Sequence, residues 1–216
     1  MISPNTDKKF AILGEAFDYI KQEGNLLYVG CATTSGKLLT YTRNNDIANL
    51  EFLAKLPGNL GGLVKMNAGL KSWEMFNYIH SIKTKDGYIK KEDVDFSYRE
   101  TKINTIVYEV VFNIEFGFSK EKLKEFNKMR DNQPHVPSAG SCFKNPKGDF
   151  AGRLIEAVGL KGIKQGDMSF SEQHANFLVN YGNGSFEDAV YLIEVAKKKI
   201  KEEFSIDIEE EIIIYK

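Results

Sequence analysis

The hydrophobic period of the chain changes near residue 118, and this change constrains the fold most. Before it, apolar and polar residues alternate, most clearly over residues 103–116, and a period of two is typical of a half-buried strand. After it, apolar residues recur every three or four positions, as in residues 185–204, which predicts an amphipathic helix. We therefore expect an α+β protein with two domains, residues 1–118 and 119–216.

The first domain is predicted to be mainly β-sheet. Residues 10–13 and 26–31 read as strands, and Asp86-Gly87 is typical of the tip of a hairpin. One helix is expected to begin at Ser35 as its N-cap, and the helical pattern resumes over residues 49–56.

The second domain is predicted to combine helices with strands. Ser119 is the expected cap of a basic helix, and Asp149 that of a short helix closed by Gly159. Ser185 and Asp188 have the spacing of a capping box at the start of a long helix. The terminal residues 208–216 read as a strand.

Composition excludes several classes of protein. The chain has 29 basic and 30 acidic residues, so no overall field attracts it to nucleic acid or to an anionic membrane. Cys31 and Cys142 match no metal spacing and no disulfide framework, and no apolar run approaches the roughly 20 residues of a membrane span. We expect a cytoplasmic protein without a metal site.

Two loops contain polar or glycine-rich stretches that a purely structural turn would not need. Residues 137–146 (PSAGSCFKNP) place a serine, a lysine and an asparagine among residues that bend the backbone. Residues 56–69 (LPGNLGGLVKMNAG) are rich in glycine, which lets backbone amides approach a ligand closely. The alternative for each segment is a purely structural turn.

Longer strings identify a family. Residues 50–69, 96–101, 130–162, 171–193 and 208–214 resemble, in order and spacing, the UDP-N-acetylenolpyruvoylglucosamine reductases, the MurB family. The short distance between FSYRET and PSAGSCFKNP resembles the compact type II members. The resemblance extends from about residue 26 to the C-terminus.

The resemblance implies a flavoenzyme of peptidoglycan precursor synthesis. Such an enzyme has a two-part FAD-binding domain followed by a substrate domain, and uses NADPH through FAD. It reduces the enolpyruvyl ether of UDP-N-acetylglucosamine to the lactyl ether of UDP-N-acetylmuramate. Residues 1–118 would then be the second, mainly β part of the FAD domain, and residues 119–216 a linker helix and the substrate domain.

Three residues resemble the catalytic residues of the family. Hydride delivery to the terminal CH₂ of the substrate leaves negative charge that must be stabilised and then protonated. Arg99 resembles the arginine that stabilises the carboxylate, and Ser141 resembles the proton donor. Glu211 resembles the catalytic acid, with Glu209 as the rival assignment. Glu210 stands where the family has a proline.

The resemblance also implies binding residues. The flavin would be contacted by Gly30, Cys31, Thr33, Pro57, Gly58, Gly61, Gly62 and Asn67. The substrate would be contacted by Tyr98, Arg130, Gln133, Lys144 and Asn145. His174 and Cys142 are expected to be structural.

The N-terminus departs from the family pattern. The chain begins where the glycine-rich turn that holds the FAD pyrophosphate has just ended in complete members. The first flavin subdomain is therefore expected to be missing, so that this chain binds FAD weakly or not at all. The alternative function is then a flavin-free UDP-sugar-binding fragment. We expect a monomer in a complete form and dimerisation or strand swapping in a truncated one.

Overall fold

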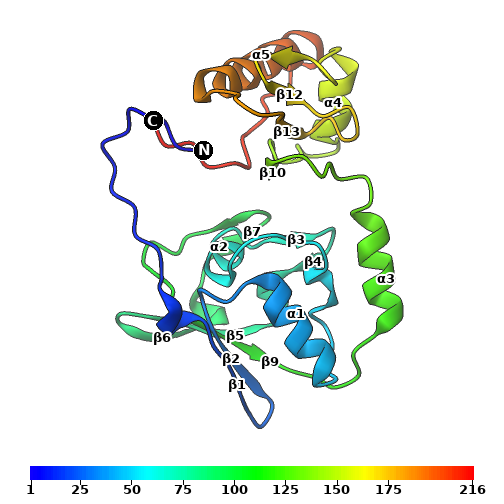
Figure 1. The fold of residues 1–216 in the computed structure, drawn as a ribbon. Helices are drawn as coiled ribbons and strands as arrows, with labels where there is room; N and C mark the ends of the chain where they lie inside the picture. Colours follow the sequence, from blue (N-terminus) through cyan, green and yellow to red (C-terminus); the bar gives the residue numbers. More distant parts are fainter. The chain divides into compact units, whose positions relative to one another are not determined.

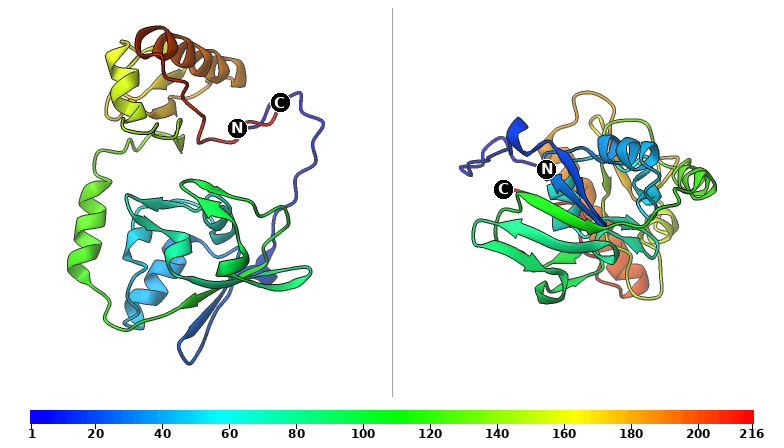
Figure 2. Two further views of the ribbon diagram at one scale, coloured as in Figure 1. Left: turned by 180° about the vertical axis from the view of Figure 1, so that it is seen from behind. Right: turned by 90° about the horizontal axis from the view of Figure 1, so that it is seen from below.

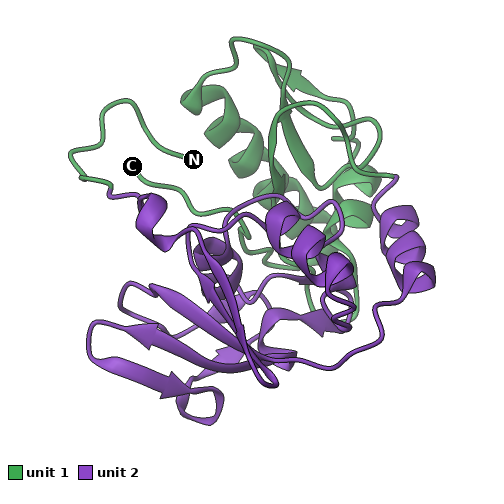
Figure 3. Ribbon diagram, turned by 60° about the horizontal axis from the view of Figure 1, so that its bottom comes forward, with its two compact units in different colours: residues 1–10, 132–216 green, residues 11–131 purple.

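The computed structural model describes residues 1–216 and divides them into two compact units (Figure 3). Unit 2 is Ala11–Asp131, and unit 1 combines Met1–Phe10 with Asn132–Lys216. This division differs from the expected boundary at residue 118. Helix α3 (Lys120–Met129) belongs to unit 2 because its Phe126, only 3% exposed, is buried in the core of that unit and packs edge-on against Trp73.

Unit 2 is built on an antiparallel sheet of five strands, as predicted for the first part of the chain (Figure 1). In spatial order, its strands are β1 (Ile20–Glu23), β2 (Leu26–Gly30), β9 (Glu109–Asn113), β5 (Ile79–Thr84) and β6 (Gly87–Lys90). The hairpin predicted around Asp86 and Gly87 is confirmed, since β5 pairs with β6 and Thr84 lies opposite Gly87.

The long strand predicted over residues 103–116 is wrong in length. The strand β9 begins at Glu109, because Gly30 of β2 and Lys83 of β5 are the last residues that pair with it. Ile103 and Val107 are buried in the core as the alternation suggests. The pattern therefore predicts burial correctly where no neighbouring strand is present.

Three other local predictions in unit 2 are corrected. Residues 10–13 form no strand. The N-cap of α1 (Ser35–Asn44) is Thr34, whose hydroxyl accepts from the amide of Lys37 at 3.2 Å. Residues 49–56 contain only the short 3₁₀ helix η2 (Glu51–Leu53), because Asn49 and Lys55 adopt φ of 72° and 54°, which no α-helix accommodates.

Short elements complete unit 2 around the sheet. They are η1 (Glu15–Phe17), α2 (Leu60–Lys65), β3 (Gly69–Leu70), β4 (Trp73–Glu74), η3 (Met75–Asn77), η4 (Lys91–Asp93), β7 (Phe96–Ser97) and β8 (Glu100–Thr101). Strand β3 pairs with β4, and β7 pairs with β8. The two small hairpins carry several of the candidate site residues.

Unit 1 is an antiparallel sheet of four strands with two helices. In spatial order the strands are β10 (Ser138–Ser141), β13 (Phe177–Asn180), β12 (Met168–Phe170) and β11 (Lys164–Gln165), and the helices are α4 (Ala151–Ala157) and α5 (Phe186–Phe204). Helix α5 packs against β11 and β12, and it is the long orange-to-red helix in Figure 2. No helix of the chain is long and apolar enough to cross a membrane.

The helix caps of unit 1 agree only in part with prediction. Ser185 and Asp188 form the predicted capping box of α5. Helix α4, however, has Phe150 at the N-cap position, and Asn145 supplies the capping oxygen to the amide of Ala151 at 3.0 Å. Asp149 instead accepts from the amide of Phe150 at 2.7 Å. The predicted cap was therefore one residue too early.

The predicted C-terminal strand over residues 208–216 is replaced by isolated bridges. Glu210 pairs with Phe143, and Tyr215 pairs with Ile2. The amides of Glu211 and Ile212 both donate to the carbonyl of Cys142. Because one acceptor serves two successive donors, a regular ladder cannot continue there.

Candidate functional site

Arg99 occupies a strained turn in unit 2. It lies between β7 and β8, where Ser97 pairs with Glu100, and its φ is 58°. Its Nη1 contacts Glu74 Oε1 at 3.1 Å, and its Nη2 donates to the carbonyl of Gly69 at 3.0 Å. The side chain is only 11% exposed. A left-handed arginine with both ends of its fork engaged is held in one orientation.

Asn67 organises the surroundings of Arg99. It is fully buried with φ of 42°. Its Nδ2 donates to Glu74 Oε2 at 2.9 Å and to the carbonyl of Ser97 at 3.0 Å, while its Oδ1 accepts from the amide of Phe76 at 3.1 Å. Glu74 thus receives hydrogen bonds from both Asn67 and Arg99. Asn67 was expected to contact flavin. Its side chain instead makes all three of these hydrogen bonds within this network.

Arg130 lies at the C-terminal end of α3 in unit 2. The residue is 5% exposed, and its Nε and Nη2 have no hydrogen-bond partner. Burial, with a smaller contribution from the charge of Arg99, lowers the pKa of Arg130 to about 10. Tyr98, another predicted substrate residue, is 41% exposed and stacks under the guanidinium of Arg99 at 4.7 Å. The structure therefore gathers Tyr98, Arg99 and Arg130 in unit 2.

Ser141 lies in unit 1, on a backbone fixed by Asn176. It ends β10, opposite Phe177, and is half-buried. The amide of Cys142 donates to the carbonyl of Asn176 at 2.6 Å. The side chain of Asn176 accepts from the amide of Phe143 at 3.0 Å and donates to its carbonyl at 2.8 Å. These bonds hold the loop that carries the predicted proton donor.

The three terminal acids differ in their contacts. Glu209 is largely exposed and pairs with Lys144 at 3.4 Å, and Glu210 pairs with Lys197 at 3.0 Å. Glu211 is half-buried, and its amide donates to the carbonyl of Cys142 at 2.9 Å. Unit 1 therefore places the backbone of Glu211 beside the residue that follows Ser141.

Cys142 lies in the core of unit 1, and His174 is half-buried next to Ala175 of that core. Cys142 is fully buried, and burial raises the pKa of its thiol, with the charges of Glu210 and Glu211 adding to the shift. The Nδ1 of His174 accepts from the amide of Asn176 at 3.3 Å, and burial lowers the pKa of the ring. Both side chains are held as neutral structural groups.

Part of the same loop lines a pocket of about 370 Å³ in unit 1. Residues 137–140 line it together with the start of α5 and Ile212. Ser141 is not among the lining residues. Gln133, predicted to bind substrate, is half-buried in the segment before this loop.

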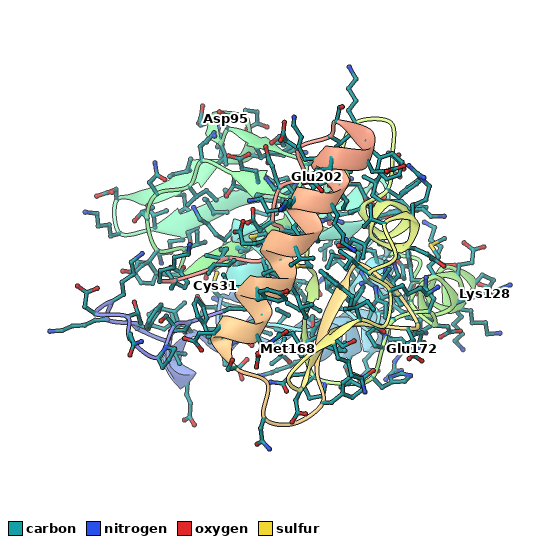
Figure 4. All side chains as sticks on the ribbon, turned by 90° about the horizontal axis from the view of Figure 1, so that it is seen from above. Cys31, Asp95, Lys128, Met168, Glu172 and Glu202 are labelled. Atoms are coloured by element: carbon teal, nitrogen blue, oxygen red, sulfur yellow. The ribbon has the colours of Figure 1, made fainter.

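The packing of unit 2 by itself accounts for several of the residues that were predicted to contact flavin. A Cβ on Gly30 would meet the carbonyl of Phe17 at 2.1 Å, and one on Gly61 would meet Cys31 at 3.2 Å. Thr33 is buried and donates to the carbonyl of Tyr19 at 3.2 Å. Cys31, labelled in Figure 4, is 2% exposed, and burial beside Glu109 raises its pKa to about 12.

The exposed part of the glycine-rich segment has a different character. Pro57, Gly58 and Gly62 are exposed. Gly58 has φ of 113°, and a Cβ on Gly62 would meet nothing within 4 Å. Because Gly58 and Gly62 carry no side chain, a ligand could approach the backbone closely here, so this stretch fits a cofactor packed against the main chain.

Sequence reasoning missed Glu74 and Asn176. Each is a single polar residue between apolar neighbours, with no motif to mark it. Each is nevertheless the centre of a hydrogen-bond network. Only the spatial proximity of their partners, which lie up to 33 residues away in the chain, reveals their roles.

Comparisons with known proteins agree with the sequence resemblance. The family model for the C-terminal domain of UDP-N-acetylenolpyruvoylglucosamine reductase matches residues 132–215. A UDP-N-acetylenolpyruvoylglucosamine reductase of Campylobacter jejuni is 46% identical over 99% of this chain and 84% of its own length. One of Helicobacter hepaticus is 45% identical over 99% of this chain and 81% of its own length.

A solved structure shows the same fold. The crystal structure of the UDP-N-acetylenolpyruvylglucosamine reductase (MurB) from Thermus caldophilus matches with a TM-score of 0.83 and 30% identity, over 94% of this chain and 76% of that one. The predicted α+β fold and the family resemblance are both confirmed. The chain belongs to the UDP-N-acetylenolpyruvoylglucosamine reductase family and is an oxidoreductase.

Proposed function

We propose that this chain reduces the enolpyruvyl ether of UDP-N-acetylglucosamine to the lactyl ether of UDP-N-acetylmuramate, a step of peptidoglycan precursor synthesis. The observation that carries the proposal is the 46% identity to a named reductase over 99% of this chain. Arg99, Ser141 and Glu211 are all present at the matching positions of the resemblance. The proposed cofactor is FAD and the proposed reductant is NADPH.

The exposed backbone of residues 57–62 supports a flavin site. Gly58 and Gly62 leave room for a flat ring beside the main chain. The amides of Leu60 and Gly61 donate to the carbonyls of Thr33 and Cys31, so they hold this surface in place. When bound, FAD supplies the hydride that reaches the terminal CH₂ of the substrate. Gly30, Cys31, Thr33, Gly61 and Asn67 would support this surface from behind, through the packing and hydrogen bonds described above.

Arg99 is proposed to stabilise negative charge on the substrate carboxylate. Its guanidinium is already oriented by Glu74 and by the carbonyl of Gly69, so little reorganisation is needed when charge develops. Tyr98, stacked on Arg99, is proposed to contact the substrate. The positive φ of Arg99 is consistent with strain retained at a functional position.

Ser141 is proposed to donate a proton to the carbon that bears the ether oxygen. The loop fixed by Asn176 would hold its hydroxyl in position, which general acid catalysis requires. Glu211 is proposed as the catalytic acid in preference to Glu209, because Glu209 is largely exposed and paired with Lys144.

Lys144 and Asn145 are proposed to bind the diphosphate and sugar, and Arg130 and Gln133 to bind other polar groups of the substrate. Lys144 would exchange its exposed partner Glu209 for a phosphate, a modest cost because the pair is open to solvent. Asn145 keeps its Nδ2 for a ligand, since its Oδ1 caps α4.

The test is conversion of the substrate itself. The purified chain is supplied with FAD, NADPH and UDP-N-acetylglucosamine enolpyruvate, and mass spectrometry measures the sugar nucleotide. We expect a product heavier by two hydrogen atoms, with matching NADPH consumption. Flavin binding and NADPH oxidation without that product would contradict the proposal. UDP-sugar binding by calorimetry without any flavin uptake would favour the binding fragment instead.

A further inference from the structure

The last residues of unit 1 are held by the first ones. All backbone hydrogen bonds of residues 213–216 go to residues 1–6, which we call the strap (Figure 1). The amide of Tyr215 donates to the carbonyl of Met1 at 2.9 Å, and the carbonyl of Tyr215 accepts from the amide of Ser3 at 2.8 Å. The strap therefore adds an extended segment alongside the C-terminal one.

Side chains reinforce this pairing. Ile2 and Tyr215 form a parallel bridge. The ring of Tyr215 lies edge-on to that of Phe10, with 5.1 Å between the centroids, and Lys8 Nζ lies 5.1 Å from the centre of the Tyr215 ring. Met1 packs against the core of unit 1. Main-chain hydrogen bonds combined with side-chain anchors are typical of a peptide recognised by strand addition.

The chain between the strap and unit 2 is an exposed linker. Residues 7–12 are all exposed and belong to no helix or strand, and Ile12 is 91% exposed. The chain enters unit 2 at Ala11 and returns to unit 1 only at Asn132. Within unit 1, only noncovalent contacts therefore hold the strap, as they would hold a bound peptide.

The segment that the strap holds also carries Glu211. The amides of Glu211 and Ile212 donate to the carbonyl of Cys142, the residue after Ser141. Beyond Ile212 the loop around Cys142 supplies no further backbone partner, and the strap supplies the remaining ones. Residues 208–216 are thus fixed at one end by the loop of Ser141 and at the other by the strap.

The strap also borders the pocket of unit 1. Met1 and Ile2 line this pocket of about 370 Å³ together with Ile212 and residues 137–140. Without the strap, the pocket would lose part of its wall, and residues 213–216 would present unpaired backbone groups, which are a template for another strand. The strap therefore covers a surface that is suited to an extended peptide.

We propose that residues 1–6 are an intramolecular ligand of unit 1, and that their binding orders the C-terminal segment and with it the backbone of Glu211. The site that they occupy is the edge of residues 213–216 and the adjoining wall of the pocket. Through the proposed role of Glu211, on which this part of the inference rests, the strap is a positioning element for the catalytic acid. It takes no part in the chemistry itself.

The experiment measures amide hydrogen exchange of the purified 216-residue chain by NMR. Ser3→Pro removes the amide that donates to Tyr215. Lys9→Pro is the matched control, because Lys9 is exposed and its amide makes no hydrogen bond. Tyr215→Ala is a second variant, which removes the ring contacts with Phe10 and Lys8 but keeps every main-chain donor.

We expect the amides of Glu211, Ile212 and Tyr215 to exchange at least about tenfold faster in Ser3→Pro than in the parent, because the strap opens more often. Tyr215→Ala should raise the same rates by a smaller factor, and Lys9→Pro should leave them unchanged. Amides within α5 should exchange equally in all four chains, since the core of unit 1 stays folded.

A synthetic peptide of residues 1–10 tests whether the strap acts as a ligand. Added to Ser3→Pro, the peptide should restore slow exchange at Tyr215 in a saturable way. The same peptide N-methylated at Ser3 should not, because its donor to Tyr215 is blocked. N-methylation at Ile2 is the matched control, since the Ile2 amide makes no hydrogen bond, and this peptide should still bind.

Three results would overturn the proposal. The first is parental exchange at residues 211–215 in both Ser3→Pro and Tyr215→Ala. The second is a peptide that restores no protection, or that acts equally when N-methylated at Ser3. The third is protection that rises with protein concentration together with a dimer in size-exclusion chromatography, which would assign the strap to a second copy. Exchange is measured without substrate or flavin, so these results are independent of whether the proposed reaction occurs.

Discussion

The two units differ in whether their buried polar side chains all have hydrogen-bond partners. In unit 1, the buried amide of Asn176 is fully engaged with the backbone of Phe143. In unit 2, Glu74, Asn67 and Arg99 satisfy one another, but Arg130 does not take part. The two atoms of Arg130 are the only buried side-chain nitrogen or oxygen atoms of the chain that have no hydrogen-bond partner.

This difference shows where the fold depends on something outside itself. Buried polar groups are nearly always satisfied in native proteins, and exceptions ask for an explanation. The Asn176 network of unit 1 is complete within the chain. The orphaned guanidinium of unit 2 is consistent with the proposed contact of Arg130 with the substrate. The following predictions are designed to break or sharpen this distinction.

The largest expected effect comes from Ser141→Ala, in flavin-loaded protein. This change removes the proposed proton donor but keeps the backbone bonds of the loop. Reoxidation of reduced flavin by the enolpyruvyl substrate should slow by about 10²–10⁴-fold, while reduction by NADPH should be nearly unchanged. Stopped-flow absorbance separates the two half-reactions. Equal slowing of both would reject the role of Ser141.

Asn176→Ala should cause the largest loss of stability in unit 1. It leaves the buried amide and carbonyl of Phe143 without their partners, at a cost of about 3 kcal/mol in the free energy of unfolding. Urea denaturation followed by far-UV circular dichroism measures it. The control is Asn183→Ala at an exposed position. Similar stability of the two variants would show that the Asn176 network is not needed.

Glu74→Gln should destabilise unit 2 by about 2 kcal/mol, because it leaves the Arg99 guanidinium without its carboxylate. Trp73 fluorescence during urea denaturation reports this loss. Adding Arg130→Met should recover part of it, since the repulsion between the two guanidinium groups is then absent. Strict additivity of the two changes would indicate that Arg99 and Arg130 do not interact.

The smallest expected effect is a pH dependence of unit 1 through His174. Burial lowers the pKa of His174 below its ordinary value of 6.5, so the unfolded chain binds the proton more readily. The stability that this neutral ring contributes is present above pH 6.5 and is lost as the pH falls below it. His174→Gln should flatten the decline in thermal midpoint on acidification. An unchanged decline would assign it to other groups.

The sequence predicted correctly those elements that depend on residues close together in the chain. The capping box at Ser185 and Asp188, the cap at Ser119 and the hairpin at Asp86-Gly87 all depend on neighbouring residues, and all three are confirmed. The ends of β9 depend instead on where β2 and β5 stop pairing. Residues 103–116 alone could not show this.

The candidate site was predictable only as a set of residues. The resemblance named Arg99 and Arg130, but their contrast depends on Glu74, which reaches one and not the other. Likewise, Asn145 carries the cap of α4 in place of Asp149 because the turn between them brings its side chain to Ala151. Which side chain hydrogen-bonds to which group is decided by tertiary contacts. The spacing of residues along the chain does not show these contacts.

Arginine-detected NMR of the Nε–H groups tests most directly the contrast between the unpaired Arg130 and Arg153, which is paired with Asp149. Spectra of the ¹⁵N-labelled chain are recorded with and without sodium pyruvate, and the signals are assigned with Arg130→Lys and Arg153→Lys. We expect pyruvate to shift the Nε–H resonance of Arg130 and to leave that of Arg153 in place. An unmoved Arg130 resonance at saturating pyruvate, or equal shifts of both signals, would contradict the proposed role of Arg130 in substrate binding.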